Sequence, residues 1–121
     1  MLFEKKIRSF VYAFAGLKIA WMQEHNFRIQ VVCAALAVLF GWLLGISPSE
    51  WTAVALAIGL VLTAETLNTA LEELCDKFKS DPDPHIEKIK DLAAGAVFLA
   101  SVSALVVGAI IFIPRIFFFL S

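Results

Sequence analysis

Four polar side chains recur along one stretch of an otherwise apolar chain of 121 residues. Glu65, Asn68, Glu72 and Asp76 are spaced i, i+3, i+7 and i+11, so on a helix they fall within an arc of about 80°. Carboxylates in such a row can accept a proton from a substrate or hold a divalent cation. This stripe is therefore the first candidate for a site that does chemistry.

The composition indicates that the stripe belongs to a membrane protein. Apolar residues make up 60% of the chain and charged residues 17%, whereas soluble domains average about 45–50% and about 25%. Ten Lys and Arg nearly balance eleven Asp and Glu, which argues against a nucleic-acid binder with a broad basic face. The two cysteines have neither metal-ligand spacing nor the density of a disulfide framework. An ordinary soluble enzyme is disfavoured, and the question becomes why so apolar a chain keeps so many acids.

Three apolar runs are long enough to cross a bilayer, or become so when extended. The first is broken only by Gln30. The second runs from Trp51 to Ala64, which is too short, so its helix must continue through polar residues to about Leu74. The third should end at Pro114. The sequence predicts an all-α membrane protein of one domain, residues 1–121, with transmembrane helices at 29–46, 51–74 and 92–113 and a cytoplasmic connection at 77–91.

Residues 1–28 precede the first span and have the pattern of a surface helix. Apolar side chains such as Phe10 and Phe14 fall on one side, and Lys5 and Arg8 fall on the other, as in an interfacial amphipathic helix. Cations concentrate here and in the second connection, so the positive-inside rule places both in the cytoplasm and the C-terminus outside. No cleaved targeting segment is expected.

Glu65 lies at membrane depth in this arrangement. It stands about 21 Å along the helix from Trp51, and Glu72 stands about 32 Å along, against a hydrocarbon core of about 30 Å. A carboxylate at such depth costs about 2.5 kcal/mol or more, so the stripe needs a cation, a metal or a polar substrate as partner. The alternative is a helix–helix contact in which Glu65 and Asn68 bond to neighbouring helices.

Glu24, just before the first span, should lie at a depth similar to Glu72. Two carboxylates at one level can hold Mg²⁺, which takes one or two protein carboxylates and completes its shell with water and phosphate oxygens. The alternative is two solvated acids at the interface. Lys90 and Asp91 stand where the third span enters the membrane, where an ammonium can neutralise phosphate charge or only anchor the helix. The chain has no Gly-x-x-x-x-Gly-Lys sequence, so any nucleotide is bound without a P-loop.

The stripe and its surroundings also match a known family. The chain closely resembles the bacterial integral-membrane diacylglycerol kinases, a family that includes undecaprenol kinases. The matching stretches are Ala64–Glu72 followed by Asp76, which give Glu-x-x-Asn-x-Ala-x-Glu-x-x-x-Asp, then Lys90–Val97, and upstream Gly16–Lys18 and Trp21–Arg28. The resemblance covers essentially the whole chain.

This resemblance implies a homotrimer of three-span subunits in the bacterial cytoplasmic membrane, with active sites shared between neighbours. It implies MgATP-dependent phosphorylation of a lipid alcohol, either diacylglycerol to phosphatidic acid or undecaprenol to undecaprenyl phosphate. By resemblance, Glu65 would be the general base, and Glu24 and Glu72 would hold the metal and contact ATP. The remaining matches are Tyr12, Lys90 and Asp91 as ATP contacts, Trp21, Phe27, Arg28 and Glu65 as lipid contacts, and Asn68 and Asp76 as supporting polar residues.

Two other classes of function stay open at this point. Intramembrane acids often mark ion paths, so the chain is alternatively a small ion- or proton-conducting subunit, although its first and third spans carry no acid. It is otherwise a membrane scaffold held together by the polar stripe. Within the kinase interpretation the acceptor lipid is open too, although Asn-Phe-Arg after Glu24-His25 is closer to the undecaprenol kinases.

Overall fold

The computed structural model describes residues 1–78 and 83–121, and nearly all of them are helical. No strand occurs among the described residues, which confirms the all-α prediction. Three of the helices are long and apolar enough to cross a membrane, as the sequence predicts. The helices are α1, Leu2–Gln23; α2, His25–Leu44; α3, Pro48–Asp76; and α4, Pro84–Leu120.

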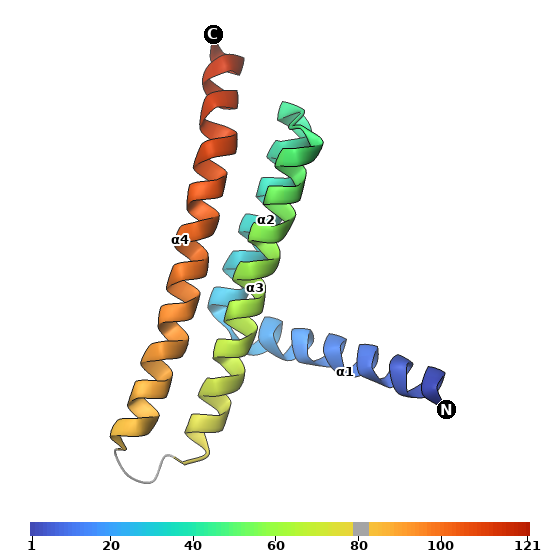
Figure 1. Ribbon diagram of the computed structural model, residues 1–121, viewed down its shortest axis with the longest axis vertical. Helices are drawn as coiled ribbons and strands as arrows, with labels where there is room; N and C mark the ends of the chain where they lie inside the picture. The colour runs from blue at the N-terminus through green and yellow to red at the C-terminus, as the bar shows by residue number, and fades with distance from the viewer. Residues whose placement is uncertain (79–82) are drawn as a thin grey trace.

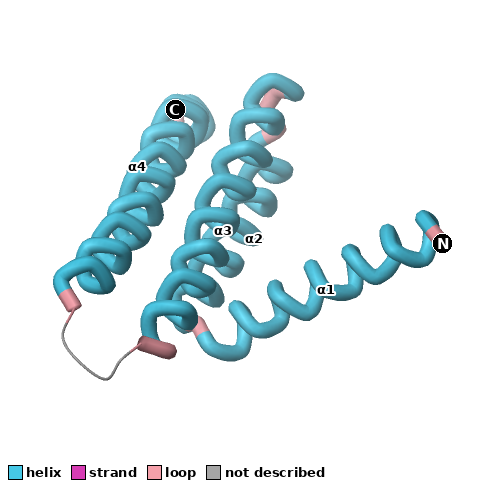
Figure 2. Tube along the Cα trace, turned by 60° about the horizontal axis from the view of Figure 1, so that its bottom comes forward, coloured by secondary structure: helices cyan, strands magenta, loops and turns pink. Residues whose placement is uncertain are grey.

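Helices α2, α3 and α4 run side by side, and α1 projects from one end of this bundle to the side (Figures 1 and 2). Helix α3 packs most extensively against α4 and less against α2. The bundle therefore has two distinct ends. We call the end at Gly45–Glu50, where α2 turns into α3, the turn end. The end that holds Glu24, Asp76 and Asp83, where α1 meets α2 and α3 leads toward α4, is the loop end.

The corner between α1 and α2 is a single residue. Glu24 has φ −110° and ψ 110°, an extended conformation that interrupts the helical hydrogen bonds. Arg28 of α2 reaches back and donates from Nη1 to the backbone oxygens of Trp21 at 3.2 Å and Met22 at 3.5 Å. The N-terminal helix thus ends at Gln23, and α2 begins at His25, four residues before the predicted membrane span at 29.

The turn between α2 and α3 follows standard capping chemistry. Gly45 ends α2 with φ 63°, a left-handed conformation that favours glycine. Ser47 then caps α3: its hydroxyl accepts from the Glu50 N–H at 3.2 Å, and the Glu50 carboxylate accepts from the Ser47 N–H at 2.9 Å. Because this capping box and Pro48 begin the helix, α3 starts at Pro48, ahead of the predicted membrane span at 51–74.

Helix α4 extends beyond the predicted membrane span 92–113 at both ends. Asp83 caps it by accepting from the His85 N–H at 2.9 Å, so α4 begins at Pro84, within the predicted cytoplasmic connection 77–91, and Pro84 suits a first helical turn. The helix also continues past Pro114 to Leu120. A proline removes one backbone hydrogen bond, but Arg115 ties this segment to the turn end, as described below. The part of the predicted connection at 79–82 lies outside the described residues.

A cluster of buried apolar side chains lies toward the turn end. Ile46, Val54 and Ile111 form the buried core, and Trp51 packs against them. At Gly41 an added Cβ would lie 2.9 Å from a Trp51 ring atom, so only glycine lets α2 and this ring come so close. Most other large apolar side chains on the bundle are exposed, as expected of a surface that faces lipid.

Candidate active site

Glu65 is the most deeply buried of the large side chains. It sits on α3 and is only 2% exposed, and Gln30 of α2 donates from Nε2 to its Oε2 at 3.5 Å. The Thr69 hydroxyl bonds to the Glu65 backbone oxygen at 3.0 Å and leaves the carboxylate free. The contact with Gln30 is long for a hydrogen bond. Glu65 is thus enclosed by the bundle while its carboxylate remains available to a ligand.

One turn further along α3, Asn68 connects to Glu72. Asn68 is 9% exposed and donates from Nδ2 to Glu72 Oε1 at 3.1 Å. Its own Oδ1 is buried, as is Oε1 of Gln30, and neither atom has a hydrogen-bond partner within residues 1–78 and 83–121. Buried polar atoms are normally paired, so two unpaired acceptors flanking Glu65 point to a missing donor.

Three carboxylates come together here, and we call Glu24, Glu65 and Glu72 the carboxylate cluster. The charges of Glu24, at the α1–α2 corner, and Glu72 both act on Glu65. Within the part of the chain that is described, no three His, Cys, Asp or Glu side chains are close enough to hold a metal by themselves. A pair of carboxylates is sufficient for Mg²⁺ that shares its shell with water and phosphate, and the unpaired Asn68 Oδ1 can accept from such a water. Glu24 and Glu72 are therefore carboxylates of the kind that Mg²⁺ takes as its protein ligands.

Asp76 and Lys90 join α3 to α4 at the loop end. The Lys90 ammonium lies 3.2 Å from Asp76 Oδ1, and both side chains are about half exposed. Asp91 follows on α4 and is exposed. Lys90 is thus held at the open side of the bundle by a contact that an incoming anion can replace, since exposed ion pairs contribute little to stability.

The remaining predicted site residues lie around the α1–α2 corner or away from it. Tyr12 is 71% exposed and stands about 18 Å along α1 from Glu24, on the helix that projects from the bundle (Figure 2). Trp21 is partly exposed, whereas Phe27 is buried with 5% exposed. The guanidinium of Arg28 bonds to the end of α1. A single chain therefore does not bring Tyr12 to the carboxylate cluster.

Gln30 is a candidate site residue to which the sequence analysis assigns no role. It contacts Glu65 and supplies one of the two unpaired acceptors. The sequence feature that could have identified Gln30 is its position. Apart from Cys33, it is the one polar residue within the apolar run 29–46. A lone amide in a membrane span is worth testing for contact with an acid on a neighbouring span.

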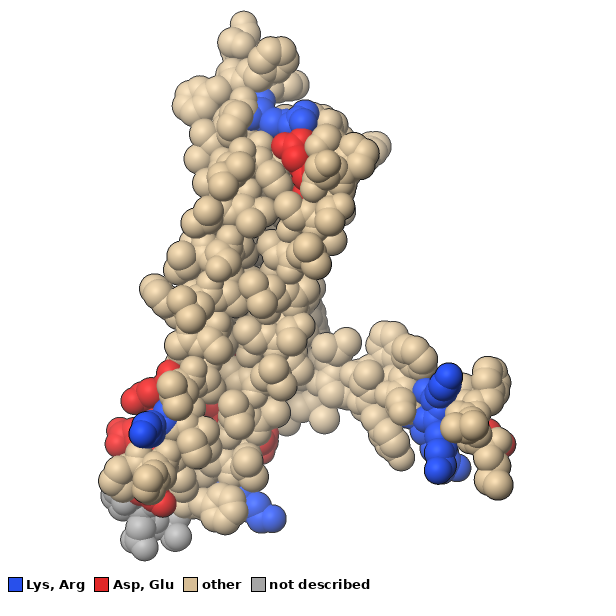
Figure 3. Space-filling model, viewed as in Figure 1, with Lys and Arg blue, Asp and Glu red and all other residues tan. Residues whose placement is uncertain are grey.

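A second polar cluster, Ser47, Glu50 and Arg115, lies at the opposite end of the bundle. Arg115 donates to both carboxylate oxygens of Glu50 and, from Nη1, to the backbone oxygen of Gly45 at 3.2 Å. Glu50 precedes the apolar run that begins at Trp51, so it lies at the water end of α3. The Ser47 backbone N–H, and then Arg115, lower the pKa of Glu50 from 4.5 to about 2. Figure 3 shows charged side chains at both ends of the bundle and on α1, and an uncharged surface between.

Known proteins are similar to this chain over most of its length. The sequence profile of the prokaryotic diacylglycerol kinases matches residues 11–112. Over 109 residues the chain is 34% identical to the undecaprenol kinase of Bacillus subtilis, covering 90% of this chain and 89% of that protein. It is 37% identical over 107 residues to a diacylglycerol kinase of Synechocystis sp., covering 88% of this chain and 61% of that protein. It is 28% identical over 109 residues to the Escherichia coli K12 diacylglycerol kinase, with coverage of 90% and 89%.

Proposed function

The chain belongs to the prokaryotic diacylglycerol kinase family, and from this premise we propose that it is an ATP- and Mg²⁺-dependent kinase of a membrane lipid alcohol. The acceptor is diacylglycerol or undecaprenol, the two alcohols for which its relatives are named. Its three apolar helices and its family make it a multi-pass membrane protein.

The observation that carries the proposal is the burial of Glu65 beside two unpaired acceptors. The carboxylate of Glu65 takes the proton of the lipid hydroxyl. The freed oxygen forms a bond to the terminal phosphorus of ATP while the bond from that phosphorus to the bridging oxygen breaks, which gives a lipid phosphate and ADP. A base that stands apart from bulk water suits an acceptor held at the membrane boundary.

Glu24 and Glu72 would hold the Mg²⁺ that accompanies the nucleotide, and the ion would supply neutralisation of the phosphate charge. Asn68 fixes the Glu72 carboxylate through the 3.1 Å hydrogen bond. Lys90 leaves Asp76 to meet a phosphate oxygen, and Asp91 contacts the rest of the nucleotide. The exposure of Lys90 and Asp91 at the loop end and the burial of Glu65 deeper in the bundle support this division of roles.

The working form is a homotrimer with active sites shared between neighbouring copies. The position of Tyr12 supports this, because α1 carries it away from the carboxylate cluster of its own chain and it can contact ATP only where another copy lies alongside. The N-terminus and the α3–α4 connection face the cytoplasm, where the Lys residues of α1 and the loop end favour them. Trp21, Phe27 and Arg28 border the entry of the lipid at the α1–α2 corner.

The test is phosphoryl transfer by the purified protein in mixed micelles. With labelled ATP and Mg²⁺, we expect label to appear in phosphatidic acid or undecaprenyl phosphate, and a mixture of both alcohols identifies the preferred one. A folded sample that phosphorylates neither alcohol contradicts the proposal. Ion flux into proteoliposomes without ATP consumption would instead favour the ion-conducting alternative.

A further inference from the structure

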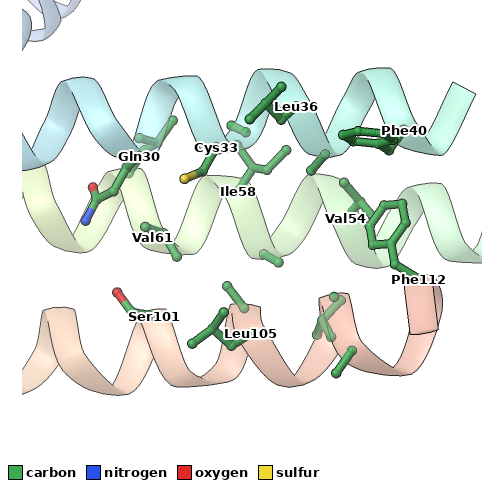
Figure 4. Close-up of a pocket in the computed structure, with 18 of the residues that line it drawn as sticks. Gln30, Cys33, Leu36, Phe40, Val54, Ile58, Val61, Ser101, Leu105 and Phe112 are labelled. Atoms are coloured by element: carbon green, nitrogen blue, oxygen red, sulfur yellow. The ribbon is translucent and has the colours of Figure 1, made fainter. Parts of the chain in front are cut away.

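Gln30 is the side chain of α2 that contacts the catalytic candidate. Its amide reaches from α2 toward α3, at the end of an apolar pocket whose other labelled side chains are hydrocarbon apart from one thiol and one hydroxyl (Figure 4). Nε2 lies 3.5 Å from Glu65 Oε2, and among the described residues this is the one side-chain hydrogen bond that Glu65 receives. The charged groups that act on Glu65 are Glu24 and Glu72, which have no hydrogen to donate when ionised. Gln30 is therefore the group placed to hold this carboxylate.

A neutral amide suits a base better than a cation does. At the turn end, Arg115 donates to both oxygens of Glu50, and a carboxylate so paired is held in its ionised form and is a poor proton acceptor. Gln30 offers Glu65 a single long contact and no charge. It can thus orient the carboxylate and leave it basic.

The oxygen of the same amide is unpaired. A carboxylate only accepts hydrogen bonds, so the amide must present Nε2 to Glu65 while Glu65 is ionised. Oε1 is then turned elsewhere, and this buried atom has no partner among the described residues. Because buried acceptors are normally paired and solvent does not reach this one, its donor must be a neighbouring group. Glu65 becomes such a donor when it takes up a proton, since a carboxylic acid carries one O–H.

We infer that Gln30 is the positioning residue of the base, donating from Nε2 to Glu65 before phosphoryl transfer and accepting at Oε1 from Glu65 after it. The inference rests on the proposed kinase function and concerns the pairing of its base. In the transfer the O–H bond of the lipid alcohol breaks, an O–H bond forms on Glu65, and the alcohol oxygen bonds to phosphorus. Both side chains end in planar groups on soft terminal torsions, so half a turn of each brings the new O–H opposite Oε1. The proton then stays on Glu65 until it returns to water before the next cycle.

This pairing acts on the chemical step. Without the amide, the ionised base has no donor to orient it and the protonated base has no acceptor. Neither change touches the groups assigned to ATP or to the lipid chain. Loss of the amide should therefore lower kcat and leave the KM values for ATP and for the lipid alcohol unchanged.

The first experiment measures kcat and both KM values for the wild type and Gln30→Met in mixed micelles. Methionine is unbranched like glutamine and lacks the amide. We expect kcat to fall about tenfold, the size of one lost hydrogen bond, with both KM values within about twofold. Ser101→Ala, which removes the hydroxyl at the same end of the pocket, is the matched control and should change none of the three. An unchanged kcat in a folded Gln30→Met protein overturns the inference.

A double variant separates positioning from a structural role. If Gln30 acts through Glu65, Gln30→Met should change the residual rate of Glu65→Gln by less than about twofold, because the group that it serves is already gone. A further loss of about tenfold in that background would show that Gln30 acts elsewhere. Gln30→Leu, which removes the amide with a different shape, should repeat both results.

The second experiment needs no turnover. Infrared difference spectra of the protein in nanodiscs, taken as the pH is lowered, show the C=O stretch of protonated Glu65, assigned by its absence from Glu65→Gln. A carboxylic acid whose O–H is hydrogen-bonded absorbs at a lower frequency than one whose O–H is free, so the band should lie higher in Gln30→Met than in the wild type. Equal frequencies overturn the pairing with Oε1. The expected difference in a protein that transfers no phosphate keeps the pairing and contradicts the kinase proposal alone.

Discussion

The two polar clusters of the bundle each contain a glutamate of α3, and they differ in how completely these carboxylates are paired. At the turn end, both oxygens of Glu50 accept from Arg115, and Ser47 completes the capping box. In the carboxylate cluster, Glu65 has one contact of 3.5 Å to Gln30. Both of the buried unpaired side-chain atoms found in the described residues, on Gln30 and Asn68, lie beside it.

This difference separates a structural cluster from a binding site. A buried acceptor without a partner costs about 1–3 kcal/mol, so such atoms persist where a ligand later supplies the donor. Among the described residues, the turn end has no buried acceptor without a partner. Its packing is also close enough that Gly41 has no room for a Cβ. The turn end is thus closely packed and its carboxylate is paired, whereas the carboxylate cluster holds unpaired acceptors. Substitutions at the two ends should therefore differ in kind.

The largest effect is expected from Glu65→Gln. Removing the proton acceptor should lower the rate of phosphoryl transfer by about 100-fold or more, measured as label transferred from ATP to lipid. Binding of MgATP, measured by equilibrium dialysis, should stay within about twofold. The unfolding temperature should not fall, because a neutral amide replaces a buried charge.

The control for this variant is Glu73→Gln. Glu73 is an exposed acid on the same helix, so its loss should leave the rate unchanged. A Glu65→Gln protein with wild-type turnover would remove Glu65 from the role of base. A variant that is inactive but also unfolded at lower temperature would place Glu65 with Glu50 as a structural residue, and the contrast between the two clusters would disappear.

Gly41→Ala should affect stability instead of chemistry. The new Cβ would stand 2.9 Å from the Trp51 ring and 3.0 Å from Ile46 Cδ1, and relieving such overpacking costs about 1–3 kcal/mol. Denaturant unfolding in detergent micelles measures this loss. Trp51→Phe in the same protein should recover part of it, because the Trp51 atoms closest to the added Cβ belong to the part of the indole that phenylalanine lacks.

Gly59→Ala is the matched glycine control. Gly59 lies within α3 with no neighbouring atom within 4 Å of an added Cβ, and alanine is the better helix former by about 1 kcal/mol. It should therefore leave stability equal or higher. Equal losses at Gly41 and Gly59 would show that close packing at the turn end is not the cause.

Asn68→Ala should weaken the response to Mg²⁺. Asn68 holds the carboxylate of Glu72 through one hydrogen bond, and loss of such a supporting partner typically lowers metal affinity about tenfold. The measurement is the Mg²⁺ concentration that gives half of the maximal rate. Thr66→Ala, which removes a hydroxyl bonded only to the Leu62 backbone on the same helix, should leave that concentration unchanged, and an equal shift in both variants would contradict a specific role for Asn68.

The three spans were largely predictable because their apolar runs dominate the sequence. The residues at which the helices begin and end depend on local capping. The capping box of Ser47 and Glu50 extends α3 into the polar residues ahead of the predicted span 51–74. The third apolar run was expected to end at Pro114, yet α4 continues to Leu120, and Arg115 in this segment bonds to Glu50 and Gly45 from a different part of the chain. These partners are 65 and 70 residues apart in the sequence, so local sequence patterns do not predict the contacts.

The site was predictable only along a single helix. Glu65, Asn68 and Glu72 share one face of α3 by their spacing, and the structure gathers them as expected. Gln30 comes from α2, 35 residues away from Glu65, and helical periodicity cannot state which face of one span meets another. Tyr12 shows the reverse case, because its suggested role depends on a neighbouring copy and its own chain leaves it exposed.

The smallest effect is expected from pH acting on Glu50. Its pKa is about 2 in the folded chain against an ordinary value of 4.5, so the folded state favours the ionised form. The resulting stabilisation is fully present above pH 4.5 and is lost as the pH falls from 4.5 toward 2. Unfolding temperatures of the wild type and Glu50→Gln should therefore differ at pH 6, and the difference should shrink toward pH 3.

Thr52→Ala supplies the comparison, because its hydroxyl bonds to the Pro48 backbone in the same turn and carries no charge that titrates. Its effect on unfolding should be independent of pH across this range. The Glu50→Gln protein should also keep its phosphoryl-transfer rate at neutral pH, since the turn end lies at the opposite end of the bundle from the carboxylate cluster. A pH-independent difference for Glu50→Gln would mean that the cap geometry, and not the ionised pair with Arg115, holds α4 to the α2–α3 turn.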